Sequence, residues 1–233
     1  MFNFSLKSKT VIPEPETFEE LMVRLDSLIG KNLAELAKLM DVPLPPSSTR
    51  GKGFAGALIE LCLGASAGNL PQPDFPKLAL ELKTMPLDCR LCPEESTFVT
   101  HAPLLGMRNV RFEDTVLYKK LSRIVFVFIE SAKEVALPER RVLGYTFWSP
   151  DDRVKQILKN DFEELMELVN TGHIEDITAR IGTVIQMRPK SASGLDLTEC
   201  VGPDGSLIKT RPRGFYLRRS FTKQIVDSFL HRQ

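Results

Sequence analysis

Six consecutive apolar residues, from Ile124 to Ile129, occupy the middle of the sequence. Side chains alternate between the two faces of a sheet, so a strand that is apolar throughout must be covered on both faces. The run is far too short to span a bilayer, which takes about 20 apolar residues. It therefore predicts the central strand of a sheet covered by helices, as in a mixed α/β fold.

Helices and further strands are predicted on both sides of this run. Thr17 and Glu20 have the spacing of a capping box, and Ser149 followed by Pro150 indicates an N-cap with proline at the first helical position. The predicted helices begin near Thr17, Asn32, Phe54, Ser149 and Thr222. Strands are predicted within "LALELKTM", "STFVTHAP", "TVIQMRPK" and "GFYLRR", the last two near a hairpin-like loop from Gly202 to Gly205.

The composition limits the class of protein. Of the 233 residues, 42% are hydrophobic and 26% are charged, which is typical of a globular chain with one large domain or two small lobes. The formal net charge is +1, so the overall charge predicts no partner. Four cysteines do not indicate a disulfide scaffold, and the segment "MFNFSLKSKT" lacks the apolar stretch of a secretory signal. We therefore expect a cytoplasmic protein without a membrane segment.

The segment "PDFPKLALELKTM" carries charged side chains at the end of an apolar run. In a strand, Glu81 and Lys83 lie on the same face, and the prolines around Asp74 indicate an irregular entry that can bring this carboxylate nearby. Mg²⁺ usually takes one or two carboxylates from a protein, and a lysine beside the metal can orient the attacking water. An edge strand with a solvated glutamate and lysine explains the motif equally well, so the motif alone leaves both interpretations open.

Two other polar groups are interpreted without a function. Cys89 and Cys92 form a single CxxC pair with His101 as the only histidine nearby, which favours an incidental loop pair over a four-ligand zinc site. A run of acids in the helix that begins near Ser149 is expected to form its solvated face. These acids are Asp161, Glu163, Glu164 and Glu167.

Four segments together resemble one family of nucleases: "GKGFAGALIELCLGASAG", "DFPKLALELKT", "TARIGTVIQMRPKSA" and "RPRGFYLRRSFT". They are similar, in the same order, to the MutH family of DNA mismatch-repair endonucleases and to its restriction-enzyme relative Sau3AI, within the PD-(D/E)xK nuclease superfamily. The resemblance implies a single domain over residues 1–233, with a restriction-endonuclease-like mixed α/β sheet flanked by helices. Two lobes would surround a DNA cleft: a catalytic lobe at about 17–130 and a C-terminal DNA-reading region at about 175–233.

The resemblance also implies roles for individual residues. Asp74 and Glu81 match the family's metal-binding carboxylates, and Lys83 matches its catalytic lysine. Glu60 matches an acidic residue that completes the catalytic set, although a glutamate on a helix is usually just solvated. Lys52 and Lys120 match lysines associated with DNA binding and activity, although Lys52 by itself would be an ordinary loop lysine.

A basic segment lies near the C-terminus, where no acid occurs between Leu207 and Lys223. Its basic residues are Lys209, Arg211, Arg213, Arg218, Arg219 and Lys223. Such a segment suits phosphate contacts, with arginine or aromatic side chains reaching base edges, but a solvated basic face over core aromatics fits as well. The resemblance implies that Arg188, Pro189 and Lys190 read a GATC site. It further implies that Tyr216 senses adenine methylation.

These implications define the expected function. A monomer would use Mg²⁺ to nick the unmethylated strand of double-stranded DNA at hemimethylated GATC sites during mismatch repair, in the cytoplasm and away from membranes. MutL would activate it after MutS has found a mismatch. Two alternatives stay open, namely a GATC restriction endonuclease that cleaves both strands and a DNA-binding protein without catalysis. The first would need a second nuclease unit, and the second would have no use for an intact set of two acids and a lysine.

Overall fold

The computed structural model describes residues 6, 8, 10–45, 53–68, 70–190 and 196–232. The α-helices in these ranges are α1 (Phe18–Leu28), α2 (Leu33–Leu39), α3 (Phe54–Leu63), α4 (Val116–Leu121), α5 (Asp152–Asn170) and α6 (Arg219–Leu230). The strands are β1 (Glu81–Leu87), β2 (Thr97–Ala102), β3 (Ile124–Glu130), β4 (Val142–Trp148), β5 (Ile185–Pro189), β6 (Thr198–Val201), β7 (Leu207–Thr210) and β8 (Arg213–Leu217). Short 3-10 helices are η1 (Pro76–Leu78), η2 (Phe112–Asp114), η3 (Leu137–Glu139) and η4 (Ile174–Asp176). The mixed α/β prediction is confirmed.

The chain folds into two compact units that are interleaved in sequence. The unit built around β3 contains Phe2–Glu95, Arg123–Ser149 and Lys223–Gln233. The unit built around β8 contains Ser96–Ser122 and Pro150–Thr222. We call them the β3 unit and the β8 unit. The lobe boundaries expected from the sequence, 17–130 and 175–233, remain a prediction.

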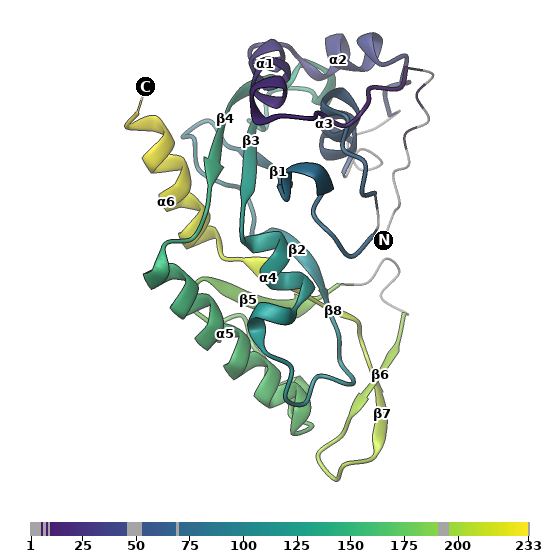
Figure 1. Ribbon diagram of the computed structural model, residues 1–233, viewed down its shortest axis with the longest axis vertical. Helices are drawn as coiled ribbons and strands as arrows, with labels where there is room; N and C mark the ends of the chain where they lie inside the picture. Colours follow the sequence, from purple (N-terminus) through teal and green to yellow (C-terminus); the bar gives the residue numbers. More distant parts are fainter. Residues whose placement is uncertain are drawn as a thin grey trace. The chain divides into compact units, whose positions relative to one another are not determined.

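The β3 unit has a sheet with strand order β1-β3-β4, in which the central β3 runs parallel to β1 and antiparallel to β4 (Figure 1). Every residue from Ile124 to Ile129 is buried, as the unbroken apolar run predicts. On one face, α1, α2 and α3 pack against Val125 and Val127. On the other face, Phe229 of α6 packs against Phe128, with ring centroids 4.8 Å apart. Gly144 of β4 lies under the Phe229 ring, where a Cβ atom would come within 2.7 Å.

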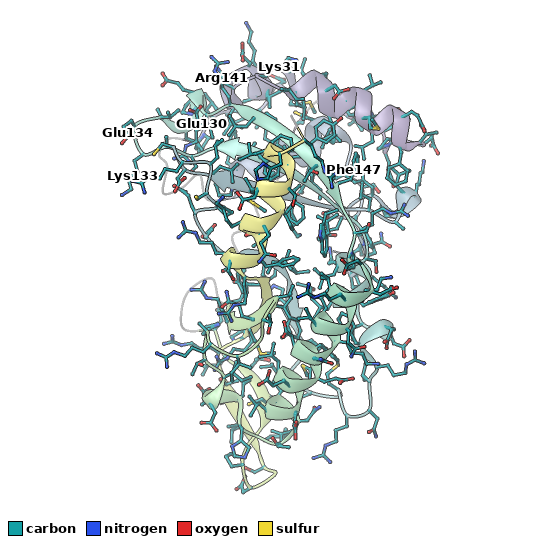
Figure 2. All side chains as sticks on the ribbon, turned by 90° about the vertical axis from the view of Figure 1, so that its left-hand side faces the viewer. Lys31, Glu130, Lys133, Glu134, Arg141 and Phe147 are labelled. Carbon is teal, nitrogen blue, oxygen red and sulfur yellow. The ribbon has the colours of Figure 1, made fainter. Side chains whose placement is uncertain are left out.

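The first two helices begin where their capping residues predict. Thr17 accepts a hydrogen bond from the N–H of Glu20 at 3.1 Å, but the Glu20 carboxylate accepts from Glu16, so only half of the expected box forms. Asn32 and Glu35 form a complete capping box. The connection between the two helices is joined to the first residue of β4, because the N–H of Val142 donates to the carbonyl of Lys31 at 3.0 Å. Arg141, directly before β4, donates to the carbonyl of Gly30 at 2.6 Å. Figure 2 shows Arg141 close to Lys31.

The predicted cap of α5 is wrong. The helix begins at Asp152, and its N-cap is Asp151, whose carboxylate accepts the N–H of Val154 at 2.7 Å. A carboxylate caps a helix N-terminus well and also interacts favourably with the positive end of the helix dipole. Ser149 and Pro150 therefore precede the helix.

The β8 unit has an antiparallel sheet with strand order β2-β8-β5 (Figure 1). One face of this sheet is buried, and Phe215 on that face contacts Phe162 of α5 at a centroid distance of 6.1 Å. β6 and β7 form a separate hairpin whose turn is the predicted loop from Gly202 to Gly205. None of the helices in the part of the chain that the structure describes is both long and apolar enough to cross a membrane.

Candidate active site and nucleic-acid interface

β1 begins with an ion pair. Glu81 and Lys83 are two positions apart on the strand and share a face, as the sequence predicts. Lys83 Nζ lies 2.5 Å from Glu81 Oε1. The Glu81 side chain is wholly buried, whereas that of Lys83 is 16% exposed. The motif alone allowed Glu81 to be a solvated side chain on an edge strand. Its complete burial excludes that interpretation.

Asp74 reaches the same place through a tight loop. Phe75 and Leu80 pair through both main-chain hydrogen bonds, at 2.9 and 3.2 Å, across the short helix η1. Ala79 adopts φ 47°, in the left-handed region that closes the loop. The Asp74 side chain is only 8% exposed, and its Oδ2 accepts the N–H of Leu82 at 2.9 Å. The irregular entry predicted from the prolines is thus a turn that carries Asp74 back beside β1.

Glu60 completes an acidic cluster, which we define as Glu60, Asp74 and Glu81. Burial by itself lowers the pKa of Lys83, but the charges of Glu81 and Asp74, the hydrogen bond from Lys83 to Glu81, and the charge of Glu60 outweigh it, so the pKa is raised. Lys83 is therefore protonated at neutral pH. Three carboxyl groups act on one ammonium, which leaves a formal excess of negative charge when all three are ionised.

The acidic cluster fits a hard divalent cation. Asp74 and Glu81 supply carboxylate oxygens in a buried setting, and Mg²⁺ typically completes its shell with water and substrate phosphate. Within the described ranges, no group of three or more His, Cys, Asp or Glu side chains is arranged to hold a metal ion by itself. The donor set thus suits a metal that is shared with a substrate rather than a closed structural site.

The β8 unit presents a second group of side chains on the open face of its sheet. Gln186 and Phe98 both pair with Tyr216, while Arg188 and His101 both pair with Gly214. A register shift between Phe98 and Thr100 places Phe98 and His101 on the same face, although they are three residues apart. We call this surface the cation–aromatic face. It comprises Phe98, His101, Arg188, Lys190 and Tyr216.

Aromatic rings and cations alternate across this face. The Arg188 guanidinium lies 5.8 Å from the centre of the Tyr216 ring, and the Lys190 ammonium lies 4.5 Å from that of Phe98. Phe98 meets Tyr216 edge-on, with centroids 5.3 Å apart. Arg188 also donates to Ser96 Oγ at 2.9 Å. Such a surface can bind phosphates through its cations and bases through its rings and base-edge contacts.

The sequence pattern did not indicate that Phe98 and His101 belong to this face. The two-residue period that assigns faces along a strand is broken by the bulge, and no local pattern marks where a bulge occurs. The His101 ring lies edge-on to Phe98, with centroids 5.3 Å apart. Burial and the charge of Lys190 together lower the pKa of His101.

The basic segment divides into buried and exposed residues. Arg213 is 5% exposed and donates to Glu175 at 3.0 Å, and Arg218 donates to the carbonyls of Gly182 at 2.9 Å and Ile181 at 3.3 Å. These two arginines hydrogen-bond within the protein, so neither phosphate contact nor a solvated basic face, the two interpretations of the segment, describes them. Lys209, Arg211 and Arg219 are exposed.

Two candidate lysines lie elsewhere. Lys120 is buried in α4 and belongs to the β8 unit, whereas the acidic cluster belongs to the β3 unit. Lys52 lies outside the described residues. Pro189 is exposed at the end of β5, directly between Arg188 and Lys190.

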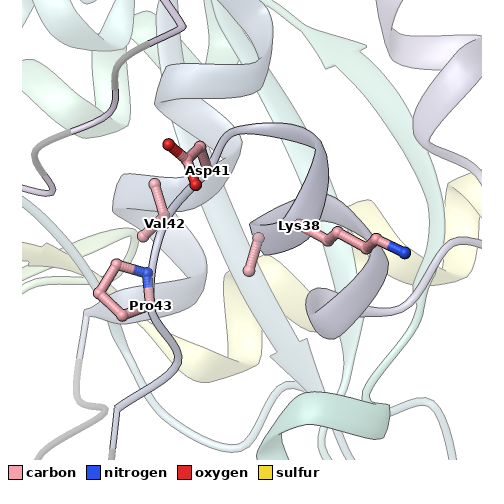
Figure 3. Close-up of a pocket in the computed structure, with 5 residues that line it drawn as sticks. Lys38, Asp41, Val42 and Pro43 are labelled. Atoms are coloured by element: carbon pink, nitrogen blue, oxygen red, sulfur yellow. The ribbon is translucent and has the colours of Figure 1, made fainter.

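A pocket of about 310 Å³ lies beside α2 (Figure 3). The residues that line it come from a different part of the sequence than the candidate site residues. It is lined by Ala37, Lys38, Asp41, Val42 and Pro43. The Lys38 ammonium points away from Asp41, Val42 and Pro43 in this view. None of the candidate residues contributes to its lining, so it is not the candidate active site.

Comparison with known proteins gives a consistent match. Residues 63–161 match the family described as DNA mismatch repair enzyme MutH. The DNA mismatch repair protein MutH of Vibrio campbellii is 46% identical over 214 residues, which cover 92% of this chain and 95% of that protein. The protein of the same name from Pectobacterium atrosepticum is 45% identical over 217 residues, covering 93% of each. That from Haemophilus influenzae is 42% identical over 216 residues, covering 93% and 97%.

Proposed function

Because the chain belongs to the MutH family of DNA mismatch repair endonucleases, we propose that it nicks the unmethylated strand of hemimethylated GATC sites with Mg²⁺. It is a DNA endonuclease with a mixed α/β fold, and its family implies DNA binding and a divalent metal requirement. The observation that carries the proposal is the meeting of Asp74, Glu81 and Lys83 at the start of β1. Two carboxylates that can hold a metal, with a lysine beside them, suit metal-assisted hydrolysis of a phosphodiester.

The proposed site residues divide the work of hydrolysis. Asp74 and Glu81 would hold Mg²⁺, with Glu60 as the third carboxylate beside it. When bound, the ion supplies a Lewis acid for the phosphate and an activated water. Lys83, whose raised pKa keeps it protonated, donates hydrogen bonds and positive charge toward the oxygens of the reacting phosphodiester.

The cation–aromatic face would supply sequence recognition. Arg188, Pro189 and Lys190 would read GATC. Arginine and lysine pair well with guanine in the major groove. Tyr216, beside Arg188, would sense the methyl group on adenine. Lys52 and Lys120 would take part in DNA binding, as the family resemblance implies.

The remaining parts of the proposal concern the setting. The enzyme would act as a monomer in the cytoplasm, where it would be activated by MutL after MutS has located a mismatch. One active site per monomer is consistent with cutting one strand at a time. A restriction enzyme that cleaves both strands would have to bring a second set of Asp74, Glu81 and Lys83 to the same DNA.

A plasmid assay tests this function. Supercoiled plasmid with hemimethylated, unmethylated or fully methylated GATC is incubated with the protein and Mg²⁺, with and without MutL. The proposal expects nicked circles from hemimethylated DNA, cut in the unmethylated strand, and more of them with MutL. Linear product without nicked intermediate would indicate a restriction enzyme. Binding without any cleavage would indicate a DNA-binding protein.

A further inference from the structure

Asp161 is buried, although the sequence predicts it on the solvated face of its helix. Its side chain is 4% exposed, whereas Glu163, Glu164 and Glu167 on the same helix are exposed, as expected. The Asp161 carboxylate accepts hydrogen bonds from the N–H groups of Thr183 at 2.7 Å, Val184 at 2.6 Å and Ile185 at 2.9 Å. Burying a carboxylate is costly unless donors surround it, and here three successive main-chain donors do so.

The segment that supplies these donors is a tight turn. Gly182 has φ 85°, and a Cβ atom there would lie 2.0 Å from the carbonyl oxygen of Ile185. The turn is therefore restricted to glycine at this position and wraps around the end of the Asp161 side chain. It leads directly into β5, which carries Arg188 three residues after Ile185.

Arg218 holds the same turn through its carbonyl groups. Its guanidinium donates to Gly182 and Ile181, and its main-chain N–H donates to the carbonyl of Val184 at 2.9 Å. An acid thus satisfies the donors of the turn, and a base satisfies its acceptors. Since Arg218 follows the last residue of β8, the turn joins the beginning of β5 to the end of β8.

This double attachment fixes the register between the two strands that form most of the cation–aromatic face. With the turn in place, Gln186 lies opposite Tyr216, and Arg188 lies opposite Gly214. Asp161 itself lies on α5, which covers the buried face of the sheet. It therefore acts on recognition only through the strand that it holds.

We propose that Asp161 and Arg218 are positioning residues for sequence recognition, which set the place of Arg188 on the DNA without contacting a base. This inference rests on the proposed function, because it assigns base reading to Arg188. Bidentate pairing with a base depends on placement to about 0.5 Å, so a shift of β5 would weaken it. Contacts with phosphate tolerate such a shift, since a point charge needs no fixed orientation.

The test compares Asp161→Asn with the control Glu163→Gln. Glu163 is an exposed acid on the same helix, so both substitutions remove one negative charge. An asparagine has one acceptor oxygen and cannot satisfy three donors as a carboxylate does. Binding is measured in Ca²⁺ to a GATC duplex and to a duplex with one base pair changed, over a range of salt concentrations. Thermal unfolding shows that each variant is folded at the assay temperature.

We expect Asp161→Asn to lose about 10-fold in the ratio of affinities for the two duplexes, a loss within the range of one bidentate base contact. Its affinity for the altered duplex and its salt dependence stay unchanged, and Glu163→Gln behaves as the wild type. A variant that is less stable but keeps the full ratio would show that Asp161 serves the fold alone, and would overturn the proposal.

Arg218→Gln provides an independent test, because Arg218 is only partly buried. The same loss of discrimination is expected. Equal weakening on both duplexes, with a smaller salt dependence, would mean that Arg218 contacts phosphate and would overturn its positioning role. Failure of the proposed function looks different, since the wild type itself would then show no preference for GATC.

Discussion

Lys83 Nζ and Glu81 Oε1 lie 2.5 Å apart at the start of β1, and the glutamate has no access to solvent. Asp74 approaches the same point from the preceding loop. If this group performs hydrolysis, Glu81→Ala and Asp74→Ala lose nicking by at least ~100-fold while binding to GATC DNA in Ca²⁺ is largely kept. Lys83→Ala loses most activity with less effect on metal binding. Wild-type nicking rates in either acid variant would remove the acidic cluster from catalysis.

Metal binding should stabilise the protein. If Mg²⁺ binds the acidic cluster, it relieves repulsion among Glu60, Asp74 and Glu81 and favours the folded state, in which they are together. At about 100 times its dissociation constant, the ion adds about 2.7 kcal/mol to the free energy of unfolding, or about 5–10 °C in Tm for a chain of this length. Glu81→Gln should abolish the shift, whereas Glu164→Gln in the β8 unit should keep it. Equal shifts in both variants, measured by calorimetry, would contradict metal binding at this site.

Affinity and sequence preference should respond to different residues. Arg219 and Lys209 are exposed, so replacing either with glutamine should weaken GATC and unrelated DNA equally. Each lost phosphate contact should reduce the slope of log affinity against log salt by about 0.9. Arg188→Ala should instead weaken GATC selectively, by roughly 1–3 kcal/mol. Equal weakening of all duplexes by Arg188→Ala would exclude base reading by this residue.

His101 should report DNA binding through its protonation. Its pKa lies below the ordinary 6.5 because burial and the Lys190 charge both disfavour the imidazolium form. The unfolded state therefore binds more protons just below pH 6.5, and stability from this group is lost as pH falls through that range. Lys190→Gln should raise the pKa of His101, as followed by the imidazole resonances in NMR. Phosphate near Lys190 should raise it too, so DNA should bind more tightly as pH falls below 6.5. If the pKa of His101 is the same in Lys190→Gln as in the wild type, the charge of Lys190 does not control the protonation of His101.

Methylation sensing should depend on Tyr216. Its ring is held edge-on by Phe98 and covered by the Arg188 guanidinium, so it presents a rigid surface that an added methyl group would meet. Tyr216→Ser should retain Mg²⁺-dependent nicking but narrow the difference in rate between unmethylated and fully methylated GATC. The rates are compared on matched unmethylated, hemimethylated and fully methylated duplexes. If the ratios equal those of the wild type, another residue senses the methyl group.

Those features of the fold that depend on short-range pattern could be predicted. The unbroken apolar run gave the central strand, and the two-residue alternation placed Glu81 and Lys83 on one face. The strands β6 and β7 were not predicted, because each is only four residues long and glycines lie between them. β4 was also missed, since Gly144 and a mixture of polar and aromatic residues interrupt its pattern.

Features that depend on contacts between distant segments could not be predicted from local pattern. The prolines around Asp74 indicated an irregular entry to β1, but they could not predict that Ala79 closes it, because alanine rarely adopts this backbone conformation. An acid among acids on a helix normally faces water, and only the turn before β5 explains why Asp161 does not. The internal roles of Arg213 and Arg218 likewise depend on partners about 36–38 residues away. The catalytic and recognition roles were suggested by family resemblance and remain to be tested.

The interleaving of the two units has a consequence for how the protein is made. A ribosome that has passed residue 222 has produced all of the β8 unit, including the cation–aromatic face. The β3 unit is then still incomplete, because Phe229 has yet to cover Phe128 and Gly144. Because its last segment comes from the end of the chain, the β3 unit cannot complete its core until synthesis is nearly finished, however early its first helices are made. A chain that ends before residue 223 thus keeps Ser96–Ser122 and Pro150–Thr222 of the β8 unit but lacks Phe229, which covers Phe128 of β3.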